Sequence, residues 1–388
     1  MTRTTLMAFA TAGLAVSVAG NVTAQDVGEF RRSAYHDYRI VTVADGLVNP
    51  WSMAFLPNGD ILVTERPGRL RIIRDGELLA TPVPGVPEVY ATGQGGLLDV
   101  VLHPDFGTSK LIYMSYSKPY ADEDGATTAI MRARFENDEL HDVEELFVAN
   151  SRGRGHYGSR IAFDREGFLF FSVGERQVPS RGDLEAHPAQ DPTNHHGTIN
   201  RLNDDGSIPE DNPFIGEDGI EQSIYSYGHR NPQGLAIHPQ TGDIWSTEHG
   251  PQGGDELNRI LPGLNYGWPV VGYGVNYGSG TTIHEGTTRE EMESPTHFWI
   301  PSIATSGLMI YAGDRFPAWK GNIFAGGLAG ERLVRLTMDG RVVTNEETLL
   351  QGIGRIRDVR EGPDGFIYVA IDGRGGDPTS IVRLEPAN

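Results

Sequence analysis

The segment WSMAFLPNGDILVTERPGRLRII, residues 51–73, decides the fold class of this chain. Two short apolar runs flank a Pro-Asn-Gly-Asp turn, and a Pro-Gly turn separates the second run from a third. Short apolar runs broken by Gly, Pro, Asn and Asp are typical of antiparallel β-strands joined by tight turns. The segment therefore predicts three consecutive strands of one antiparallel sheet.

Five further segments repeat this pattern along the chain. They are GLLDVVLHPDFGTSKLIYMSYS from Gly96, SRIAFDREGFLFFSVGER from Ser159, QGLAIHPQTGDIWSTEHG from Gln233, SGLMIYAGDRFPAWKGNIFAGGLAGERLVRL from Ser306 and IRDVREGPDGFIYVAIDG from Ile356. One such sheet cannot bury both of its faces alone, whereas a ring of sheets can. The six copies therefore predict an all-β, six-bladed β-propeller.

The ends of the ring need a partner, because an open sheet edge would pair with another chain. The stretch YRIVTVADGL, which begins at Tyr38, precedes the first complete repeat. We expect it to close the ring as an N-terminal strand in the last blade. A double β-sandwich or a two-domain all-β protein is the alternative.

The composition excludes several classes of function. The chain carries 52 Asp and Glu against 32 Lys and Arg, a net charge of -20. Nucleic-acid binding needs a concentrated basic face, so this charge argues against it. The chain has no cysteine, which excludes disulfides, thiolate metal sites and cysteine nucleophiles.

The first residues resemble an export signal. Arg3 is followed by an apolar run over residues 6–19 and by small residues before Gln25. This pattern predicts a signal peptide over residues 1–24 and a periplasmic or secreted protein. Residues 25–388 are expected to form one propeller domain. No other apolar run approaches the length of a membrane span.

Polar side chains recur just before the first strand of several repeats. They are Gln94, His156, Arg230, Asn231, Arg355 and Arg357. The first strand of each blade lines the central channel of a propeller, so these residues should converge at one mouth of the ring. Guanidinium groups bind carboxylates, and an imidazole accepts protons near neutral pH. Glu175, one strand after His156, could orient that imidazole.

Each of these residues could also be a solvated or turn-forming side chain when it is considered alone. Their joint placement at equivalent points of different repeats instead indicates a site for a small polyanionic ligand.

The segment STEHGPQGGDELNRI, residues 246–260, offers oxygen ligands for a metal ion. Asp255 and Glu256 supply carboxylates, and Gly250 and Pro251 could present backbone carbonyls in a turn. Flexible ligation by oxygen atoms suits calcium better than magnesium or zinc. An acidic turn that faces water is an equally valid interpretation.

Several longer motifs occur in a fixed order between about residue 47 and residue 383. They are GQGGLLDVVLHPDF, GHYGSRIAFD, YGHRNPQGLA, EHGPQGGDELN, NYGWP and RIRDVREGPDGFIYV. With these motifs the chain resembles the soluble pyrroloquinoline quinone (PQQ)-dependent sugar dehydrogenases of the glucose/sorbosone dehydrogenase family, especially the aldose sugar dehydrogenase branch. The resemblance implies oxidation of an aldose sugar at its anomeric carbon to the lactone, with hydride transfer to PQQ. An external electron acceptor, a quinone or a cytochrome, would then reoxidise the cofactor.

The resemblance also assigns roles to the candidate residues. His156 would be the general base, Glu175 its support, and Arg230 the cation beside the reactive quinone carbonyl. The remaining matches to cofactor-binding positions are Gln94, Asn231, Arg355 and Arg357. PQQ carries three carboxylates, which explains a cluster of arginines in an acidic protein.

Two calcium sites are implied in the same way. The carbonyls of Gly250 and Pro251 match ligands of a calcium ion beside PQQ, and Glu256 with the backbone of Tyr266 matches a second, structural site. The chain departs from the family where a lysine normally contacts PQQ, because Ala329 stands there. Either Arg332 or a neighbouring group compensates, or the affinity for PQQ is reduced or lost.

Two other functions remain open at this point. Six-bladed calcium propellers also hydrolyse lactones, and a propeller can bind a carbohydrate or a protein without catalysis. A neutral lactone has no use for an arginine cluster, which argues against the hydrolase. Because Ala329 stands where a lysine normally contacts PQQ, both alternatives stay open.

Overall fold

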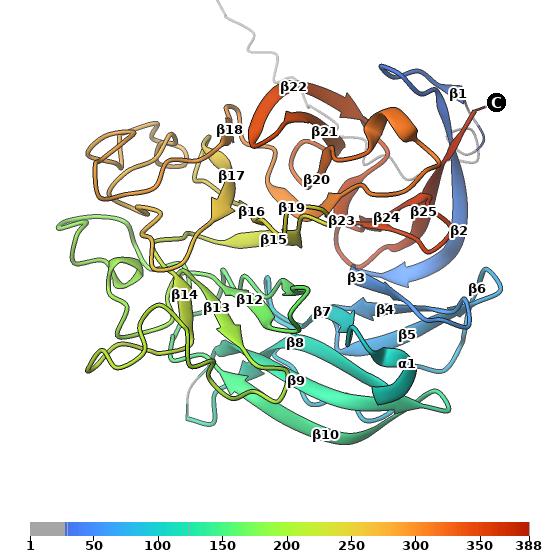
Figure 1. Ribbon diagram of the computed structural model, residues 1–388, viewed down its shortest axis with the longest axis horizontal. Helices are drawn as coiled ribbons and strands as arrows, with labels where there is room; N and C mark the ends of the chain where they lie inside the picture. The colour runs from blue at the N-terminus through green and yellow to red at the C-terminus, as the bar shows by residue number, and fades with distance from the viewer. Residues whose placement is uncertain (1–27, 29, 123, 388) are drawn as a thin grey trace, which may run out of the picture.

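A ring of six antiparallel sheets forms the computed structural model, and each sheet is one blade of a β-propeller (Figure 1). The structure describes residues 28, 30–122 and 124–387, so the predicted signal peptide lies outside the described residues. Each of the six sequence repeats supplies the first two strands of one blade. First strands of neighbouring blades contact one another and line the central channel. The predicted fold class is confirmed.

Blades 1 to 3 take up the first part of the ring. Blade 1 consists of β3 (Pro50–Phe55), β4 (Ile61–Glu65), β5 (Arg69–Arg74) and β6 (Glu77–Leu78). Blade 2 consists of β7 (Leu97–Leu102), β8 (Leu111–Pro119), β9 (Ala126–Glu136) and β10 (Glu139–Val148). Blade 3 consists of β11 (Ile161–Phe163), β12 (Leu169–Val173), β13 (Thr198–Leu202) and β14 (Ile224–Ser226).

Blades 4 to 6 complete it. Blade 4 consists of β15 (Pro232–Ile237), β16 (Ile244–Glu248), β17 (Asp255–Ile260) and β18 (His297–Trp299). Blade 5 consists of β19 (Thr305–Ile310), β20 (Ile323–Gly327), β21 (Arg332–Asp339) and β22 (Val342–Leu349). Blade 6 contains β23 (Arg355–Glu361), β24 (Ile367–Asp372) and β25 (Pro378–Pro386), followed outward by β2 (Tyr38–Val48) and β1 (Phe30–Arg31).

The ring is closed by the N-terminal strand, as the sequence predicts. Strand β2 pairs antiparallel with β25 from Tyr38 opposite Pro386 to Val48 opposite Pro378. The two strands run side by side at the edge of blade 6 in Figure 1. The short strand β1 adds a fifth strand that the sequence analysis does not anticipate.

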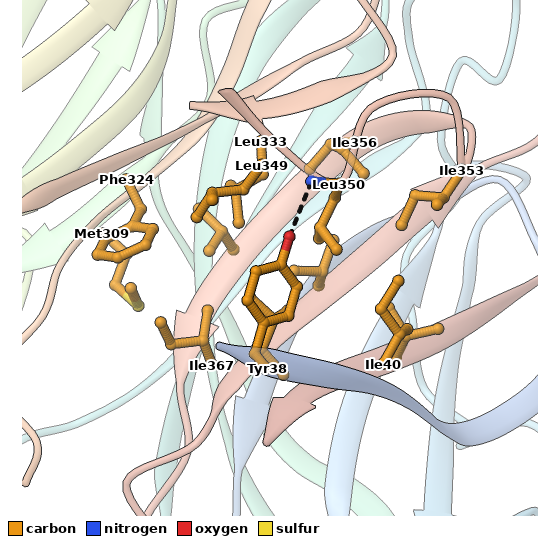
Figure 2. Close-up of a cluster of buried hydrophobic side chains, with 14 of the residues drawn as sticks. Tyr38, Ile40, Met309, Phe324, Leu333, Leu349, Leu350, Ile353, Ile356 and Ile367 are labelled. Atoms are coloured by element: carbon orange, nitrogen blue, oxygen red, sulfur yellow. Dashed lines mark hydrogen bonds between the residues drawn. The ribbon is translucent and has the colours of Figure 1, made fainter. Parts of the chain in front are cut away.

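The hydrophobic core lies between neighbouring blades. Figure 2 shows one such cluster, in which Tyr38 of β2 packs with side chains of blades 5 and 6, including Phe324 and Ile367. The Tyr38 hydroxyl also accepts a hydrogen bond of 3.4 Å from the backbone N–H of Leu350. Because each sheet is covered on both faces, strands such as β24 are buried throughout their length.

The central channel is filled by charged side chains. Arg160, which is buried, directs Nη1 at Oδ1 of Asp358 at 2.9 Å and at Oδ1 of Asp99 at 3.5 Å. Arg360 joins the same two carboxylates at 2.9 and 3.0 Å. These residues come from blades 2, 3 and 6, so the network connects opposite sides of the ring.

Helical structure is sparse. Among the described residues, one short helix, α1 (Phe106–Ser109), and two 3-10 turns, Pro188–Gln190 and Pro317–Trp319, occur in the connections. Within the described part of the chain, no helix has the length and apolar character needed to cross a membrane.

Candidate active site

A cavity of about 490 Å³ opens at one mouth of the ring. Its walls come from the first residues of first strands and the segments before them, and from the ends of second strands and the segments after them. Among the residues that line it are Trp51, Arg66, Gln94, Tyr157, Asn231, Gln233, His249, Leu328, Arg355, Arg357, Asp372 and Arg374. Four of the predicted site residues, Gln94, Asn231, Arg355 and Arg357, are therefore brought together. Arg230 lines a smaller adjoining cavity, and His249 lies in both.

His156 is 6% exposed and adjoins the cavity through two residues that line it, its chain neighbour Tyr157 and its hydrogen-bond partner Gln94. Its backbone has a positive φ of 45°, a conformation that costs energy for a residue other than glycine. Two bonds hold it there, because the backbone N–H donates to Oε1 of Gln94 at 2.7 Å and the carbonyl accepts from Nη1 of Arg176 at 2.8 Å. The position of the imidazole is thus fixed by its surroundings.

The imidazole forms a close pair with Glu175. Nδ1 of His156 lies 2.6 Å from Oε1 of Glu175, while Oε2 of Glu175 accepts the backbone N–H of Val178 at 3.1 Å. The glycine before Glu175 makes this approach possible, since a Cβ at Gly174 would lie 2.1 Å from the His156 carbonyl oxygen. With Nδ1–H donating to the carboxylate, Nε2 of His156 is left as a proton acceptor.

The protonation states follow from burial and neighbouring charge. Burial lowers the pKa of His156 below its ordinary value of 6.5; Glu175 opposes this shift and Arg230 adds to it. Burial would raise the pKa of Glu175, but His156 and then Arg230 outweigh it, and the pKa is lowered. At neutral pH the pair is therefore a neutral imidazole beside an ionised carboxylate, the state that a general base requires.

Arg230 places its guanidinium next to this pair. Nε lies 4.0 Å from Oε1 of Glu175, and Nη1 donates to the carbonyls of His249 and Gly250 at 3.1 and 2.7 Å. Nε is buried and has no hydrogen-bond partner. The backbone N–H of Arg230 is anchored on Oε2 of Glu248 at 2.6 Å. A fixed cation with one unused donor is suited to stabilise negative charge on a ligand.

Arg355 and Arg357 lie at the start of the first strand of blade 6, not before it as the sequence predicts, and share one carboxylate. Asp372 lies 3.7 Å from Nε of Arg355 and 3.1 Å from Nη2 of Arg357. Gln233 reaches Arg357 from blade 4 at 3.3 Å and so links the two sides of the mouth. Burial lowers the pKa of Arg357 to about 10, with Asp372 opposing and Arg66 and Arg355 reinforcing the shift. Nε of Arg357 is also buried without a partner.

His249 is a site residue that the sequence analysis missed. Burial lowers the pKa of His249 to about 3, and electrostatic interactions with Arg230, His156 and Arg357 add to this shift. His249 is thus close enough to three of the predicted site residues to interact with them. Nε2 of His249 lies 2.6 Å from the carbonyl of Thr305. The histidine stands beside Gly250 in EHGPQGG, a segment for which the sequence predicts only metal ligands.

The four predicted metal ligands share the smaller cavity, of about 10 Å³, which is lined by Gly250, Pro251, Glu256 and Tyr266 together with Glu248. Glu256 stands opposite Glu248 in the ladder between β16 and β17. Burial, and then Glu248, raise the pKa of Glu256 well above its ordinary value. No group of three or more His, Asp or Glu side chains among the described residues is arranged to hold a metal ion. A cation here would therefore depend on backbone carbonyls.

Asp255 takes a different role from its neighbour Glu256. Its Oδ1 accepts the backbone N–H of Gly250 at 2.9 Å, and its Oδ2 accepts that of Thr305 at 3.3 Å. The carboxylate holds the loop that carries Gly250, and is not directed at the small cavity.

Ala329 is exposed in the turn after β20, and neither it nor Arg332 lines the larger cavity. Nε of Arg332 instead donates to the carbonyl of Gly330 at 3.3 Å. Arg332 is therefore not among the cationic groups of the larger cavity.

Comparisons with known proteins show the family to which the chain is similar. The family model described as Glucose / Sorbosone dehydrogenase matches residues 47–383. Aldose sugar dehydrogenase YliI of Escherichia coli is 41% identical over 358 residues, covering 90% of this chain and 93% of that protein. Quinoprotein glucose dehydrogenase B of Acinetobacter calcoaceticus is 26% identical, covering 89% and 88%.

Solved structures give the same result. The soluble aldose sugar dehydrogenase of Escherichia coli has a TM-score of 0.84 at 40% identity, covering 90% of this chain and 100% of that chain. The PQQ-bound form of an aldose sugar dehydrogenase from Streptomyces coelicolor has a TM-score of 0.71 at 30% identity, covering 90% and 98%. The chain belongs to the glucose/sorbosone dehydrogenase family.

Proposed function

We propose that this protein is a PQQ-dependent aldose sugar dehydrogenase that oxidises the anomeric carbon of its substrate to the lactone. The observation that carries the proposal is the placement of a neutral, carboxylate-supported imidazole beside an arginine-rich cavity. A lactone hydrolase needs no such cavity, because its substrate is neutral. Family membership supports the same chemistry.

The residues of the cavity fit a quinone with three carboxylates. Four arginines line it against a single carboxylate, in a chain whose net charge is -20. The buried Nε atoms of Arg230 and Arg357 lack partners, and an anionic ligand would satisfy them. Gln94, Asn231, Arg355 and Arg357 would hold the cofactor. When bound, PQQ accepts the two electrons that leave the sugar.

Side chains of the protein then accept the proton of the substrate and stabilise the charge that develops. His156 accepts the proton of the anomeric hydroxyl at Nε2, and Glu175 stabilises the imidazolium that results. Arg230, held by two backbone carbonyls, offers its positive charge without having to reorient. The catalytic residues of the proposal are thus His156, Glu175 and Arg230.

Calcium completes the proposal. The carbonyls of Gly250 and Pro251 would bind one ion beside the cofactor, and Glu256 with the Tyr266 carbonyl would bind a second. Support comes from the paired carboxylates of Glu248 and Glu256, which a divalent cation would neutralise. In the free protein the Gly250 carbonyl accepts from Arg230, so binding of the first ion would require this bond to be shared or exchanged.

The remaining proposals concern location and partners. We place the mature protein, residues 25–388, in the periplasm or outside the cell after removal of residues 1–24. A quinone or a cytochrome would receive the electrons. These proposals rest on the sequence pattern of the first residues and on the chemistry of a two-electron cofactor.

A cofactor titration tests the proposal. Purified protein with excess Ca²⁺ is expected to bind PQQ with a saturable quench of tryptophan fluorescence, since Trp51 lines the cavity. The loaded protein should reduce an artificial dye when glucose is added, and protein treated with a chelator should not. Absence of PQQ binding, combined with calcium-dependent hydrolysis of a lactone, would establish the hydrolase instead.

The Glu175→Gln variant tests the histidine pair. Loss of the carboxylate removes a charge that raises the pKa of His156, so this pKa should fall further below 6.5. The acid limb of the profile of kcat/KM against pH should therefore move to lower pH. The plateau should drop about 10²- to 10³-fold because the imidazolium loses its support.

Glu185→Gln is the matched control, since Glu185 is exposed and pairs with Arg289 at 2.7 Å. It should leave both limbs of the profile in place. An acid limb of the Glu175 variant that stays fixed or moves to higher pH would contradict the assignment.

A further inference from the structure

Arg66 is a cavity residue with no role in the site described so far. It directly follows β4 and lines the larger cavity. Its Nη1 donates to the carbonyl of Gly93 at 2.7 Å, whereas its Nε is buried and has no hydrogen-bond partner. The side chain is thus held at the cavity while part of its donor capacity stays unused.

Arg66 also differs from the other three arginines of the cavity in its charge balance. Arg355 and Arg357 share Asp372, and Arg374 pairs with Glu331 at 3.0 Å. Within the part of the chain that the structure describes, Arg66 forms no ion pair with a carboxylate.

The acid nearest to Arg66 in sequence is already engaged. Glu65 accepts from the backbone of Val48 and from Arg69 and Arg71. The positive charge of Arg66 acts on the cavity itself, since it contributes to the lowered pKa values of Arg357 and Asp372.

The repeat geometry relates Arg66 to Ala329. Arg66 follows the second strand of blade 1 by one residue, and Ala329 follows the second strand of blade 5 by two. Both positions lie at the same mouth of the ring, where Arg66 and Leu328, the neighbour of Ala329, line one cavity. Arg66 therefore places a cation at the same mouth to which the turn after β20 contributes.

We propose that the Arg66 guanidinium binds a carboxylate of the quinone cofactor and so supplies the cationic contact that Ala329 cannot provide. This inference rests on the proposed function. A planar fork with a free Nε–H donates to a carboxylate through two parallel bonds, which a lysine cannot do. The chain thereby retains an anion contact at the mouth with a different residue from a different blade.

Fluorescence titration of PQQ into the calcium-loaded apoprotein measures the contribution of Arg66. The Arg66→Gln variant should raise the Kd about 10- to 100-fold, the effect of losing one charge-assisted contact. Arg66→Lys should give an intermediate Kd. Adding Ala329→Lys to Arg66→Gln should recover part of the affinity, and thermal unfolding of each variant checks that it is folded.

Arg332→Gln is the matched control, because Arg332 is close to Ala329 in sequence and does not line the cavity. Its Kd should equal that of the wild type. If the wild type binds PQQ and Arg66→Gln binds it equally well, the inference is wrong and the proposed function stands. If the wild type does not bind PQQ, both are wrong. Equal weakening by Arg332→Gln would reduce the effect to overall charge and overturn the inference.

Discussion

The His156→Ala variant is expected to oxidise sugar about 10²- to 10⁴-fold more slowly than the wild type, the range for loss of a general base. The imidazole is neutral at neutral pH, and Nδ1 is committed to Glu175 at 2.6 Å, so Nε2 alone can take the substrate proton. The alanine removes that acceptor and leaves the arginines of the cavity in place. Pre-steady-state reduction of the bound cofactor, followed by absorbance, measures the step directly.

The affinity for PQQ should change less than threefold in the same variant, because His156 does not line the larger cavity. His141→Ala serves as control, since His141 lies on the outer strand β10 of blade 2 and only approaches Glu139 at 4.0 Å. If turnover survives in His156→Ala, the assignment of His156 as the general base is wrong, and His249 becomes the next candidate.

Arg160→Met should produce the largest loss of stability. Arg160 is 1% exposed and connects Asp358 with Asp99 across the channel. Its removal therefore leaves two buried carboxylates without one of their cationic partners. Breaking a buried ion pair by removing one partner costs about 3–5 kcal/mol in free energy of unfolding. Denaturant unfolding followed by tryptophan fluorescence gives this quantity.

Two further variants serve as a control and as a test of partial recovery. Arg341→Met removes an exposed pair with Asp243 and should cost less than about 1 kcal/mol. Arg160→Met combined with Asp358→Asn should recover part of the loss, because Arg360 still balances Asp99. A single Arg160→Met variant as stable as Arg341→Met would show that Arg360 alone neutralises both carboxylates.

The fold was predictable because turn residues mark the ends of the apolar runs in each repeat. Each unit has two apolar runs around a Pro or Asp turn, and this is enough to give the number and order of the blades. The N-terminal closure was also predictable, because an unpaired strand preceded the first unit. Strand β1 was not, since two residues carry no periodicity.

The site was predictable where a residue stands at an equivalent point of a repeat. Gln94, Asn231, Arg355 and Arg357 were found in this way, and the structure brings them to one cavity. Arg66 and His249 were missed because they follow second strands, and only the closed ring shows that these ends reach the same mouth. Asp255 and Glu256 are adjacent in sequence, so only their backbone contacts distinguish the loop anchor from the carboxylate at the cavity.

The pairing of β2 with β25 makes blade 6 depend on two segments that are far apart in the sequence. Arg355, Arg357 and Asp372 stand on a blade whose outer strands are contributed by residues 30–31 and 38–48. Without the pairing of residues 378–386 to β24 and β2, this blade would lack the strand that joins its inner and outer parts. We therefore expect the complete cavity to form only when two segments far apart in the sequence have paired.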